Sequence, residues 1–354
     1  MNYDQRKRPR PGGDEGILTD QQATDLRSLA RQMNAAAIPE PEDDEKLRLV
    51  SGFSDIFVTL GLALFTGALA YLTERLGLTT MWAVLAVTAW LLAEFFTLRR
   101  RMALPSIALL VLFAVAVFSC ATYLLGAVLG VAVEPDVSEI LGSGDSLIFV
   151  GAALLTLALT ALHYFRFRVP ITIAAGTAAL AVAVIGLISA VAPGFVEVYL
   201  KPLVLLTGLG VFALAMRFDL ADPQRATRRT DIAFWLHLLA APMIVHPLIA
   251  QLSEGADMST VAPAVLAVFL ALGIVAVVID RRAMLVSGLV YAGYALGSLF
   301  QRVGFADTTT PLTALALGAF VLLLSAGWRP VRTGLLKLLP SHLAHRLPHP
   351  ILSS

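Results

Sequence analysis

The stretch from Asp231 to Leu252, DIAFWLHLLAAPMIVHPLIAQL, is an apolar run of membrane length with two histidines and two prolines in its interior. At 1.5 Å per residue, the part from Ile232 onward forms a helix of about 31 Å, enough to cross the hydrocarbon core of a bilayer. A proline inside a helix removes a backbone hydrogen bond and bends the helix. We therefore predict a membrane-spanning helix that is bent near its middle.

The composition of the whole chain indicates the same class of protein. Of its 354 residues, 58% are hydrophobic and 14% are charged, which is more apolar than a soluble core of this size requires. A net charge of +1 gives no reason to expect nucleic acid as a partner. The single cysteine, Cys120, excludes a disulfide within the chain and argues against a cysteine-based metal site, and we expect no cofactor.

Apolar runs of span length follow one another from Phe53 onward. Their lengths predict an all-α polytopic bundle of about ten transmembrane helices. We place these spans at 53–72, 78–98, 104–130, 147–165, 169–192, 202–218, 232–252, 260–279, 283–300 and 311–328.

The positions of the arginines and lysines test this number of spans. With the N-terminus in the cytosol, the loops on that side and the C-terminal tail hold fifteen of them, whereas the outer loops hold Arg75, Lys201 and Arg302. The fifteen are Arg99, Arg100, Arg101, Arg166, Arg168, Arg217, Arg225, Arg228, Arg229, Arg281, Arg282, Arg329, Arg332, Lys337 and Arg346. This is a positive-inside signature, and one span more or fewer would scramble it. We therefore expect both termini to be cytosolic.

The segments outside the bundle differ in composition. Thr19 and Gln22 have capping-box spacing at the start of an amphipathic pattern, and Pro39 and Pro41 interrupt an acidic stretch. We divide the chain into a disordered basic tail at 1–15, a short cytosolic helix at 16–33, an acidic linker at 34–52, the bundle at 53–328, and a basic, histidine-containing interfacial tail at 329–354.

The two histidines of the broken span are the main candidates for a polar site inside the membrane. His237 and His246 lie deep in the run, and an ionisable side chain at such depth usually faces the bundle interior. Pro242 and Pro247 each leave a backbone carbonyl four residues earlier without its usual donor. The alternative interpretation is that each neutral imidazole only bonds such a carbonyl or a neighbouring hydroxyl.

Four other residues are candidates for lining a cavity. Asp55 and Glu94 lie within about one turn of the cytosolic interface, where they can instead reach water or pair with arginines such as Arg101. Tyr291 and Tyr294 share a helix face with nearby glycines, although a tyrosine hydrogen-bonded in the interior is the alternative. At His163 and Tyr164, next to Arg166, the pattern is typical of an aromatic and basic interface belt.

The C-terminal tail carries three histidines with helical spacing. His342, His345 and His349 could bind a transition metal from one helix face. Pro348 and Pro350 limit the helix, however, and the surrounding leucines favour a segment that lies on the inner leaflet.

The sequence lacks the common enzyme motifs. It has no Gly-x-Ser-x-Gly, no Walker loop, no His-Glu-x-x-His and no glycine-rich dinucleotide turn. We also expect the spans to hold no two buried aspartates, as an intramembrane aspartyl protease would require. We therefore assign no catalytic residue.

The N-terminal segment from Gly16 to Ala23, Gly-Ile-Leu-Thr-Asp-Gln-Gln-Ala, resembles a group of bacterial inner-membrane proteins known only as a domain of unknown function. That group has a short cytosolic Gly-Ile/Leu-Leu/Ile-Ser/Thr-x-x-Gln-Ala segment ahead of its membrane helices. The resemblance implies a multi-pass protein of the inner membrane and brings no catalytic residues. In its number of spans and the side of its termini, the chain is also similar to drug/metabolite transporters.

These observations favour a transporter-like or solute-binding membrane protein whose site lies on the span at 232–252. Five spans in each half, at 53–200 and 202–328, would give the halves opposite orientations, as in inverted-repeat transporters. The alternative is a non-catalytic scaffold or sensor whose N-terminal helix recruits a cytosolic protein. The expected partners are thus the lipid bilayer, a small solute and a cytosolic protein.

The charge distribution makes a direct prediction about topology. Reporters active only in the cytosol should work when fused after Arg101, Arg168, Arg229, Arg282 or Ser354. Reporters that require the outer compartment should work in the loops at 134–146 and 253–259. Cytosolic activity from the 134–146 loop would contradict ten spans.

Overall fold

A computed structural model of the chain describes residues 21–22, 24–26, 28, 53–133, 146–222, 225, 227–340 and 347. The chain divides into two compact units, Met1–Lys46 and Leu47–Ser354. In the first unit, the described residues between Gln21 and Ser28 are helical and exposed. The rest of the predicted N-terminal helix, the tail at 1–15, the linker at 34–52 and the three tail histidines His342, His345 and His349 lie outside the described residues.

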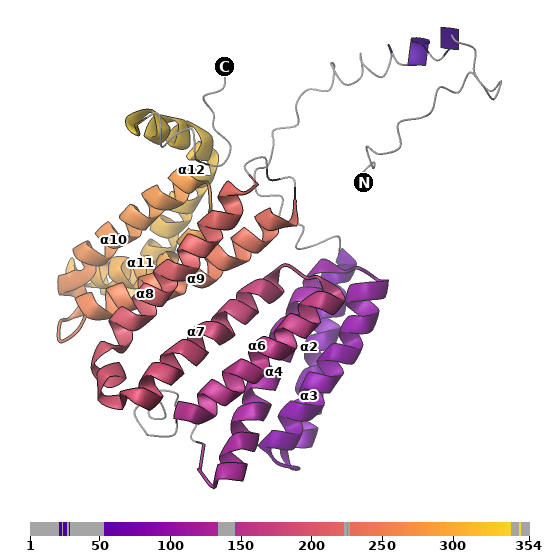
Figure 1. The fold of residues 1–354 in the computed structure, drawn as a ribbon. Coiled ribbons are helices and arrows are strands. Elements are labelled where there is room, and N and C mark those ends of the chain that lie inside the picture. Colours follow the sequence, from indigo (N-terminus) through magenta and orange to yellow (C-terminus); the bar gives the residue numbers. More distant parts are fainter. Residues whose placement is uncertain are drawn as a thin grey trace. The chain divides into compact units, whose positions relative to one another are not determined.

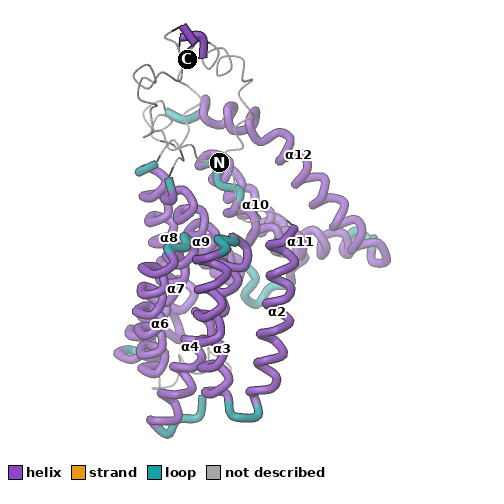
Figure 2. The backbone as a smooth tube through the Cα atoms, turned by 90° about the vertical axis from the view of Figure 1, so that its right-hand side faces the viewer, coloured by secondary structure: helices purple, strands orange, loops and turns teal. Residues whose placement is uncertain are grey.

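The described part of the second unit is all helical (Figure 1). Ten of its helices are long and apolar enough to cross a membrane, which confirms the predicted fold class. They are α2 (Phe53–Glu74), α3 (Leu78–Ala93), α4 (Ala103–Leu129), α6 (Ser146–Phe167), α7 (Ile171–Val191), α8 (Pro193–Leu220), α9 (Arg228–Leu252), α10 (Met258–Ile279), α11 (Ala283–Arg302) and α12 (Thr309–Leu338). A π-helical turn, Glu94–Arg99, extends α3, and a 3₁₀ turn, Ala306–Thr308, precedes α12. Short loops join many of the neighbouring helices (Figure 2).

The helices pack as antiparallel hairpins. The most extensive contacts lie within the pairs α3–α4, α6–α7, α8–α9 and α10–α11. Neighbouring hairpins meet through α4 and α6, through α7 with α8 and α9, and through α9 and α11. Helix α2 packs on α3 and α4, and α12 packs on α11 and α10.

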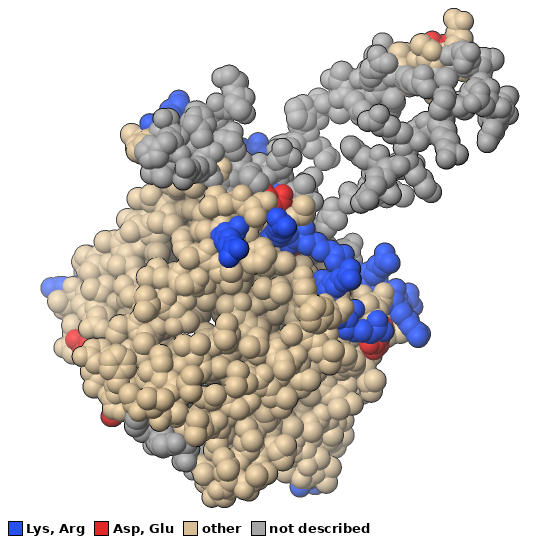
Figure 3. Space-filling view, in the orientation of Figure 1, with Lys and Arg blue, Asp and Glu red and all other residues tan. Residues whose placement is uncertain are grey.

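Ion pairs between loops agree with the predicted sidedness. Glu94 pairs with Arg166, and Arg225 pairs with Asp280, so loops assigned to the cytosol meet one another. Lys201 pairs with Glu254, both in loops assigned to the outside. Figure 3 shows most of the visible lysines and arginines gathered along one edge of a surface that carries few other charges. We call the end of the bundle with Arg166 and Arg225 the arginine-rich side, which the charge distribution predicts to be cytosolic.

Helix α9 is the most enclosed of the ten. In its most apolar stretch 61% of the residues are buried, against 44% or less in any other helix. Leu236 and Ala240 are fully buried and pack in one cluster with Val211 of α8 and Ala174 of α7. The stretch from Asp231 to Leu252 therefore forms the centre of the second half of the bundle.

The helix with the predicted bend is continuous, and a different helix is interrupted. The α9 helix runs without a break from Arg228 to Leu252, with Pro242 and Pro247 inside it. It is α8 that is interrupted, at Tyr199, where φ is −110° and ψ is 18°. We expected a span beginning at 202, but α8 begins at Pro193, so Pro202 lies inside it. Because Pro202 cannot donate to the carbonyl four residues back, the helix distorts just before it.

The last helix is longer than expected. We placed the end of the span at 328, but α12 continues to Leu338, through Pro330. Trp328, Arg332 and Leu336 are buried at a spacing of four residues, so one helix face packs across the predicted boundary. The helix of the last span therefore continues through residues 329–338, beyond the predicted end of the span.

The α8–α9 hairpin depends on one small residue. A Cβ added at Gly208 would lie 2.8 Å from the Cβ of Met243 and 2.9 Å from its backbone carbon. A Cβ at Gly210, two residues further along α8, would meet nothing within 4 Å. The backbones of α8 and α9 thus approach closely at Gly208, as small residues allow between membrane helices.

Replacing Gly208 by alanine should therefore destabilise the bundle. We expect Gly208→Ala to cost about 1–3 kcal/mol, because the new methyl group collides with backbone that must shift. Gly210→Ala is the matched control, and it should be neutral or stabilise by up to about 1 kcal/mol, since alanine is the better helix former. Thermal unfolding of both variants in one detergent measures the difference, and equal melting temperatures would contradict the close approach.

Candidate functional site

A buried acid, base and cation meet where α8 ends. Asp219 is the second-last residue of α8, and its Oδ2 lies 2.8 Å from Nε2 of His237 on α9. The guanidinium of Arg281 donates from Nε to the same Oδ2 at 3.0 Å and from Nη2 to Oδ1. None of the three side chains is more than 1% exposed. We refer to Asp219, His237 and Arg281 as the triad.

The protonation of His237 decides the charge of the triad. An ionised Asp219 accepts a hydrogen bond from Nε2–H of His237 and hydrogen bonds from both donors of Arg281, an arrangement that compensates a buried carboxylate. With His237 neutral the triad has no net charge. Among the described residues Nδ1 of His237 has no hydrogen-bond partner, so it is the nitrogen at which an additional proton would bind. Taking up that proton would give the triad a charge of +1 away from water.

The turn between α10 and α11 supplies the arginine and a second buried acid. Asp280 ends α10 in the left-handed conformation, with φ of 58°, which aspartate adopts more readily than most residues. Its Oδ1 accepts a hydrogen bond of 2.7 Å from Nε1 of Trp328 on α12. Its Oδ2 lies 3.0 Å from Arg225 and 3.8 Å from Arg332. Adjacent residues of one turn, Asp280 and Arg281, are thus held by different helices.

Two further contacts fasten this region. Arg225, in the connection between α8 and α9, donates from Nη2 to the backbone carbonyl of Asp280 at 2.9 Å. The guanidinium of Arg282 lies 5.0 Å from the ring centre of Trp328, a cation–π contact. The triad and these contacts together join α8, α9, the α10–α11 turn and α12 on the arginine-rich side.

The start of α9 is set by a cap. The Thr227 side chain accepts from the backbone N–H of Arg229 at 3.3 Å, as an N-cap residue does. Oδ2 of Asp222 in turn accepts from the backbone N–H of Thr227 at 2.8 Å and from its hydroxyl at 2.6 Å. This cap fixes where α9 begins and hence which of its residues faces Asp219.

The second predicted histidine has a different environment. Nδ1 of His246 and the hydroxyl of Tyr291 on α11 form a hydrogen bond, and the imidazole is exposed rather than buried. His246 lies nine residues after His237, about 14 Å further along α9. The structure therefore gives the two histidines separate partners. Tyr294 is 68% exposed and faces away from the interior.

Both acids predicted near the interface have a hydrogen-bond partner on another helix. Asp55 is fully buried, contrary to the solvated interpretation, and its Oδ2 accepts from the backbone N–H of Ala103 at 3.2 Å. An acid at the first turn of α4 compensates the positive end of that helix. Glu94 receives two hydrogen bonds from Arg166, from Nε at 2.9 Å and from Nη2 at 2.7 Å.

His163 also departs from expectation, because it is 1% exposed rather than part of an interface belt. Its ring packs among Trp90, Phe113 and Phe167, with centroid distances of 5.7, 5.5 and 4.4 Å. No acid or cation contacts it among the described residues. This histidine is a packing residue of an aromatic cluster.

Several residues of this region were not predicted to be site residues. They are Asp219 and Arg281 of the triad, and Asp280 with its partners Arg225 and Arg332. From the sequence, Arg225, Arg281 and Arg332 were only topology signals in loops and the C-terminal tail. We expected no two buried aspartates inside the spans; Asp219 and Asp280, which are 1% and 3% exposed, each lie one residue beyond a predicted span end, at 218 and 279. Each of the two has its own arginine, unlike the proton-sharing pair of an aspartyl protease. In the described part no group of histidine, cysteine, aspartate and glutamate could hold a metal ion.

No protein-family model, curated protein or solved structure matches the chain. The resemblances to a domain of unknown function and to drug/metabolite transporters therefore receive no support from these comparisons. The helices themselves define the class, which is an integral membrane protein with ten membrane-spanning helices in an all-α bundle.

The triad predicts strong non-additivity between its members. Asp219→Leu leaves a buried arginine without its carboxylate, and Arg281→Met leaves the carboxylate without its arginine. Each should cost about 3–5 kcal/mol, because an uncompensated buried charge remains. The double variant should be more stable than either single one, as measured by thermal unfolding in detergent. Costs that simply add would show that the two charges do not compensate each other.

Proposed function

We propose that the protein is a proton-linked solute transporter in which the triad binds the coupling proton. The observation that carries this proposal is a histidine paired with a carboxylate and an arginine, none of them more than 1% exposed, where α8, α9 and the α10–α11 turn meet. Ionisable groups in that environment are costly and commonly form proton pathways. The triad combines a proton acceptor with two fixed charges whose balance the proton changes.

The contacts of the triad suggest what proton uptake changes. A proton on His237 places a third charge beside the guanidinium of Arg281, which is buried and has no water to screen it. Repulsion between the two cations weakens the hold of Asp219 on Arg281. Because Arg281 belongs to the same turn as Asp280, this loosens the junction of α8, α9, α10 and α12 on the arginine-rich side. Proton uptake thereby favours opening of that side.

The solute site lies further along α9 in this proposal. Pro242 and Pro247 separate the triad from His246, and each proline leaves a backbone carbonyl without its helical donor. His246 and Tyr291 add an exposed imidazole and a hydroxyl that join α9 to α11. Such helix irregularities with polar groups are where membrane transporters bind their solutes.

An inverted repeat gains no support from the helix contacts. Helix α4, the third span, contacts α2, α3, α6 and α7. Its counterpart in the second half, α10, packs mainly on α11, with smaller contacts to α12 and α9. The most extensive contact of α4 is with α3, the helix before it, whereas that of α10 is with α11, the helix after it. The transporter proposal therefore depends on the second half alone and not on symmetry.

A scaffold or sensor is the second candidate. This candidate is favoured because Asp219 and Asp280 each already have an arginine partner. Such ion pairs suit a junction that stays fixed as well as one that changes with protonation. The exposed helical residues between Gln21 and Ser28 lie in a separate unit and could recruit a cytosolic protein. A scaffold requires no change in the triad when the proton concentration changes.

Proton flux distinguishes the two candidates. Purified protein is reconstituted with a pH-sensitive dye inside the vesicles and is given panels of sugars, amino acids, organic anions and organic cations. We expect at least one class to cause proton influx, and we expect His237→Gln and Asp219→Asn to reduce that influx by tenfold or more. His163→Gln is the matched control, because His163 is equally buried but has no ionic partner.

Hydrogen exchange in the same vesicles provides a readout that needs no solute. A transporter should show pH-dependent protection at the α10–α11 turn, after correction for the intrinsic exchange rate, and His237→Gln should abolish that dependence. Solute uptake that persists in His237→Gln with an unchanged proton flux would contradict proton coupling at the triad. A turn equally protected at every pH, with no flux for any panel, would favour the scaffold.

A further inference from the structure

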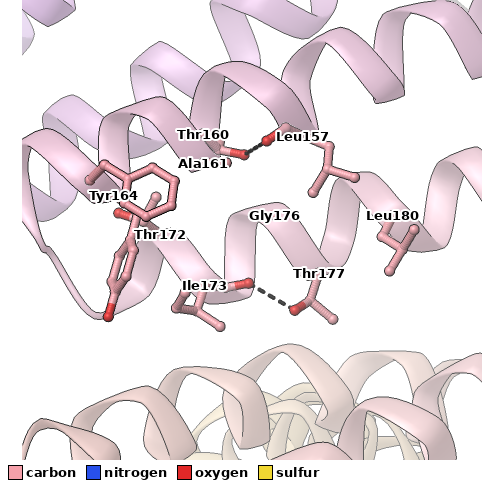
Figure 4. Close-up of a pocket in the computed structure, with 10 residues that line it drawn as sticks. Leu157, Thr160, Ala161, Tyr164, Thr172, Ile173, Gly176, Thr177 and Leu180 are labelled. Atoms are coloured by element: carbon pink, nitrogen blue, oxygen red, sulfur yellow. Dashed lines mark hydrogen bonds between the residues drawn. The ribbon is translucent and has the colours of Figure 1, made fainter.

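A groove separate from the triad runs between α6 and α7. It has a volume of about 300 Å³ and is lined by both helices of the hairpin (Figure 4). From Leu180 to Thr172 it follows α7 for eight residues, or about 12 Å. The hydrocarbon core of a bilayer is about 30 Å thick, so this length fits within one leaflet.

The groove opens on the surface that faces the bilayer. Phe165 is 77% and Leu180 48% exposed, and both line it. Its base is kept open by Gly176, where an added Cβ would lie 3.5 Å from Leu157 and 3.5 Å from Thr160. An apolar furrow in contact with hydrocarbon is filled by the chains of the surrounding lipid, because no aqueous ligand reaches it.

One end of the groove is polar, and it lies on the arginine-rich side. Of the three threonines that line it, Thr160 and Thr177 donate to carbonyls of their own helices, as the dashed lines of Figure 4 show. Thr172, at the start of α7, is 2% exposed, and its hydroxyl has no partner among the described residues. Tyr164 lies at the same end, and no hydrogen bond of its hydroxyl is found within the described part.

The turn that closes this end carries a cation. Arg168 lies between α6 and α7, is exposed, and makes no ion pair with any described residue. Its neighbour Arg166 is already held by both carboxylate oxygens of Glu94. Along the chain, Arg168 is four residues from both Tyr164 and Thr172. A cation and hydroxyl donors at one end of a groove match the oxygens of a phosphodiester, and basic sites at the cytoplasmic ends of membrane helices bind anionic lipid headgroups.

We infer that the α6–α7 groove is a binding site for one anionic phospholipid. One acyl chain lies along Gly176, and the phosphate is placed against Arg168 at the end with Tyr164 and Thr172. The ligand comes from the leaflet on the arginine-rich side. The site involves none of the triad residues, so it is independent of the transporter proposal.

Native mass spectrometry of the full chain tests this site. The protein is reconstituted in nanodiscs that contain equal amounts of phosphatidylglycerol and phosphatidylcholine with identical acyl chains, and the lipids retained after release are counted. We expect one phosphatidylglycerol to remain on the wild type. Gly176→Leu, which fills the groove, and Arg168→Gln, which removes the cation, should each lower its occupancy by fivefold or more.

Matched variants separate this site from general lipid contact. Gly61→Leu is the control for the groove, because a Cβ at Gly61 on α2 would meet nothing within 4 Å. Arg101→Gln is the control for the cation, because Arg101 has a φ of 54° and Arg168 a φ of 55°, both in turns on the same side. Both controls should retain the lipid as the wild type does.

Three results would overturn the inference. They are equal retention of both lipids by the wild type, equal loss in the variants and their controls, and displacement of the bound lipid by glycerol 3-phosphate, which lacks acyl chains. If Gly176→Leu fails to fold, Arg168→Gln against Arg101→Gln decides the outcome alone, since both substitutions are at exposed positions.

Discussion

A charge buried among membrane helices must have a counter-charge within hydrogen-bonding distance, and this constraint organises the second half of the bundle. Asp219 ends α8 inside the protein, so Arg281 must come from the α10–α11 turn to meet it. That turn then brings Asp280 into the interior as well, where it requires Arg225 and Trp328. One buried carboxylate thus determines the position of a turn, and the turn determines the position of two further helices. The hydrophobic effect cannot do this within a bilayer, because lipid chains are as apolar as the side chains that they contact.

Close packing supplies what the charges do not. Helix α9 is enclosed because Ala240 and Ala241 let its neighbours approach and because Gly208 admits Met243. The same tight fit explains how α9 remains a continuous helix despite Pro242 and Pro247, since surrounding helices restrain a backbone that has lost two hydrogen bonds. The turn before Pro202 lies near the outer end of α8, and there the backbone leaves the helical conformation at Tyr199. Proline therefore marks a weak point in a membrane helix, but packing decides whether the helix breaks there.

Span number and order followed from the sequence because hydrocarbon thickness sets the length of each apolar run, which is a local property of the chain. The ionic partners of the buried side chains did not follow from the sequence, because they depend on which helices become neighbours. Arg225, Arg281 and Arg332 carry the same positive-inside signal whether they are solvated or buried, so their pairing with Asp219 and Asp280 has no signature in the order of residues. Asp55 was misjudged for the same reason, since its contact with the start of α4 depends on the packing of α2 against α4. His237 was found because a histidine in an apolar run is conspicuous on its own.

The comparison of His163 with His237 shows what makes a buried histidine a candidate for function. Both rings are 1% exposed or less, and both lie in apolar helices. Around His163 there are only aromatic rings, so protonation would place a bare charge in a site with nothing to compensate it, and the neutral form is the one that fits. Around His237 the carboxylate of Asp219 favours the protonated ring and the guanidinium of Arg281 opposes it. Opposed charges bring the two protonation states closer in free energy, and a group whose states are close in energy can respond to a proton gradient. Depth in the membrane therefore identifies a histidine worth considering, and the charges around it distinguish a candidate for protonation from a packing residue.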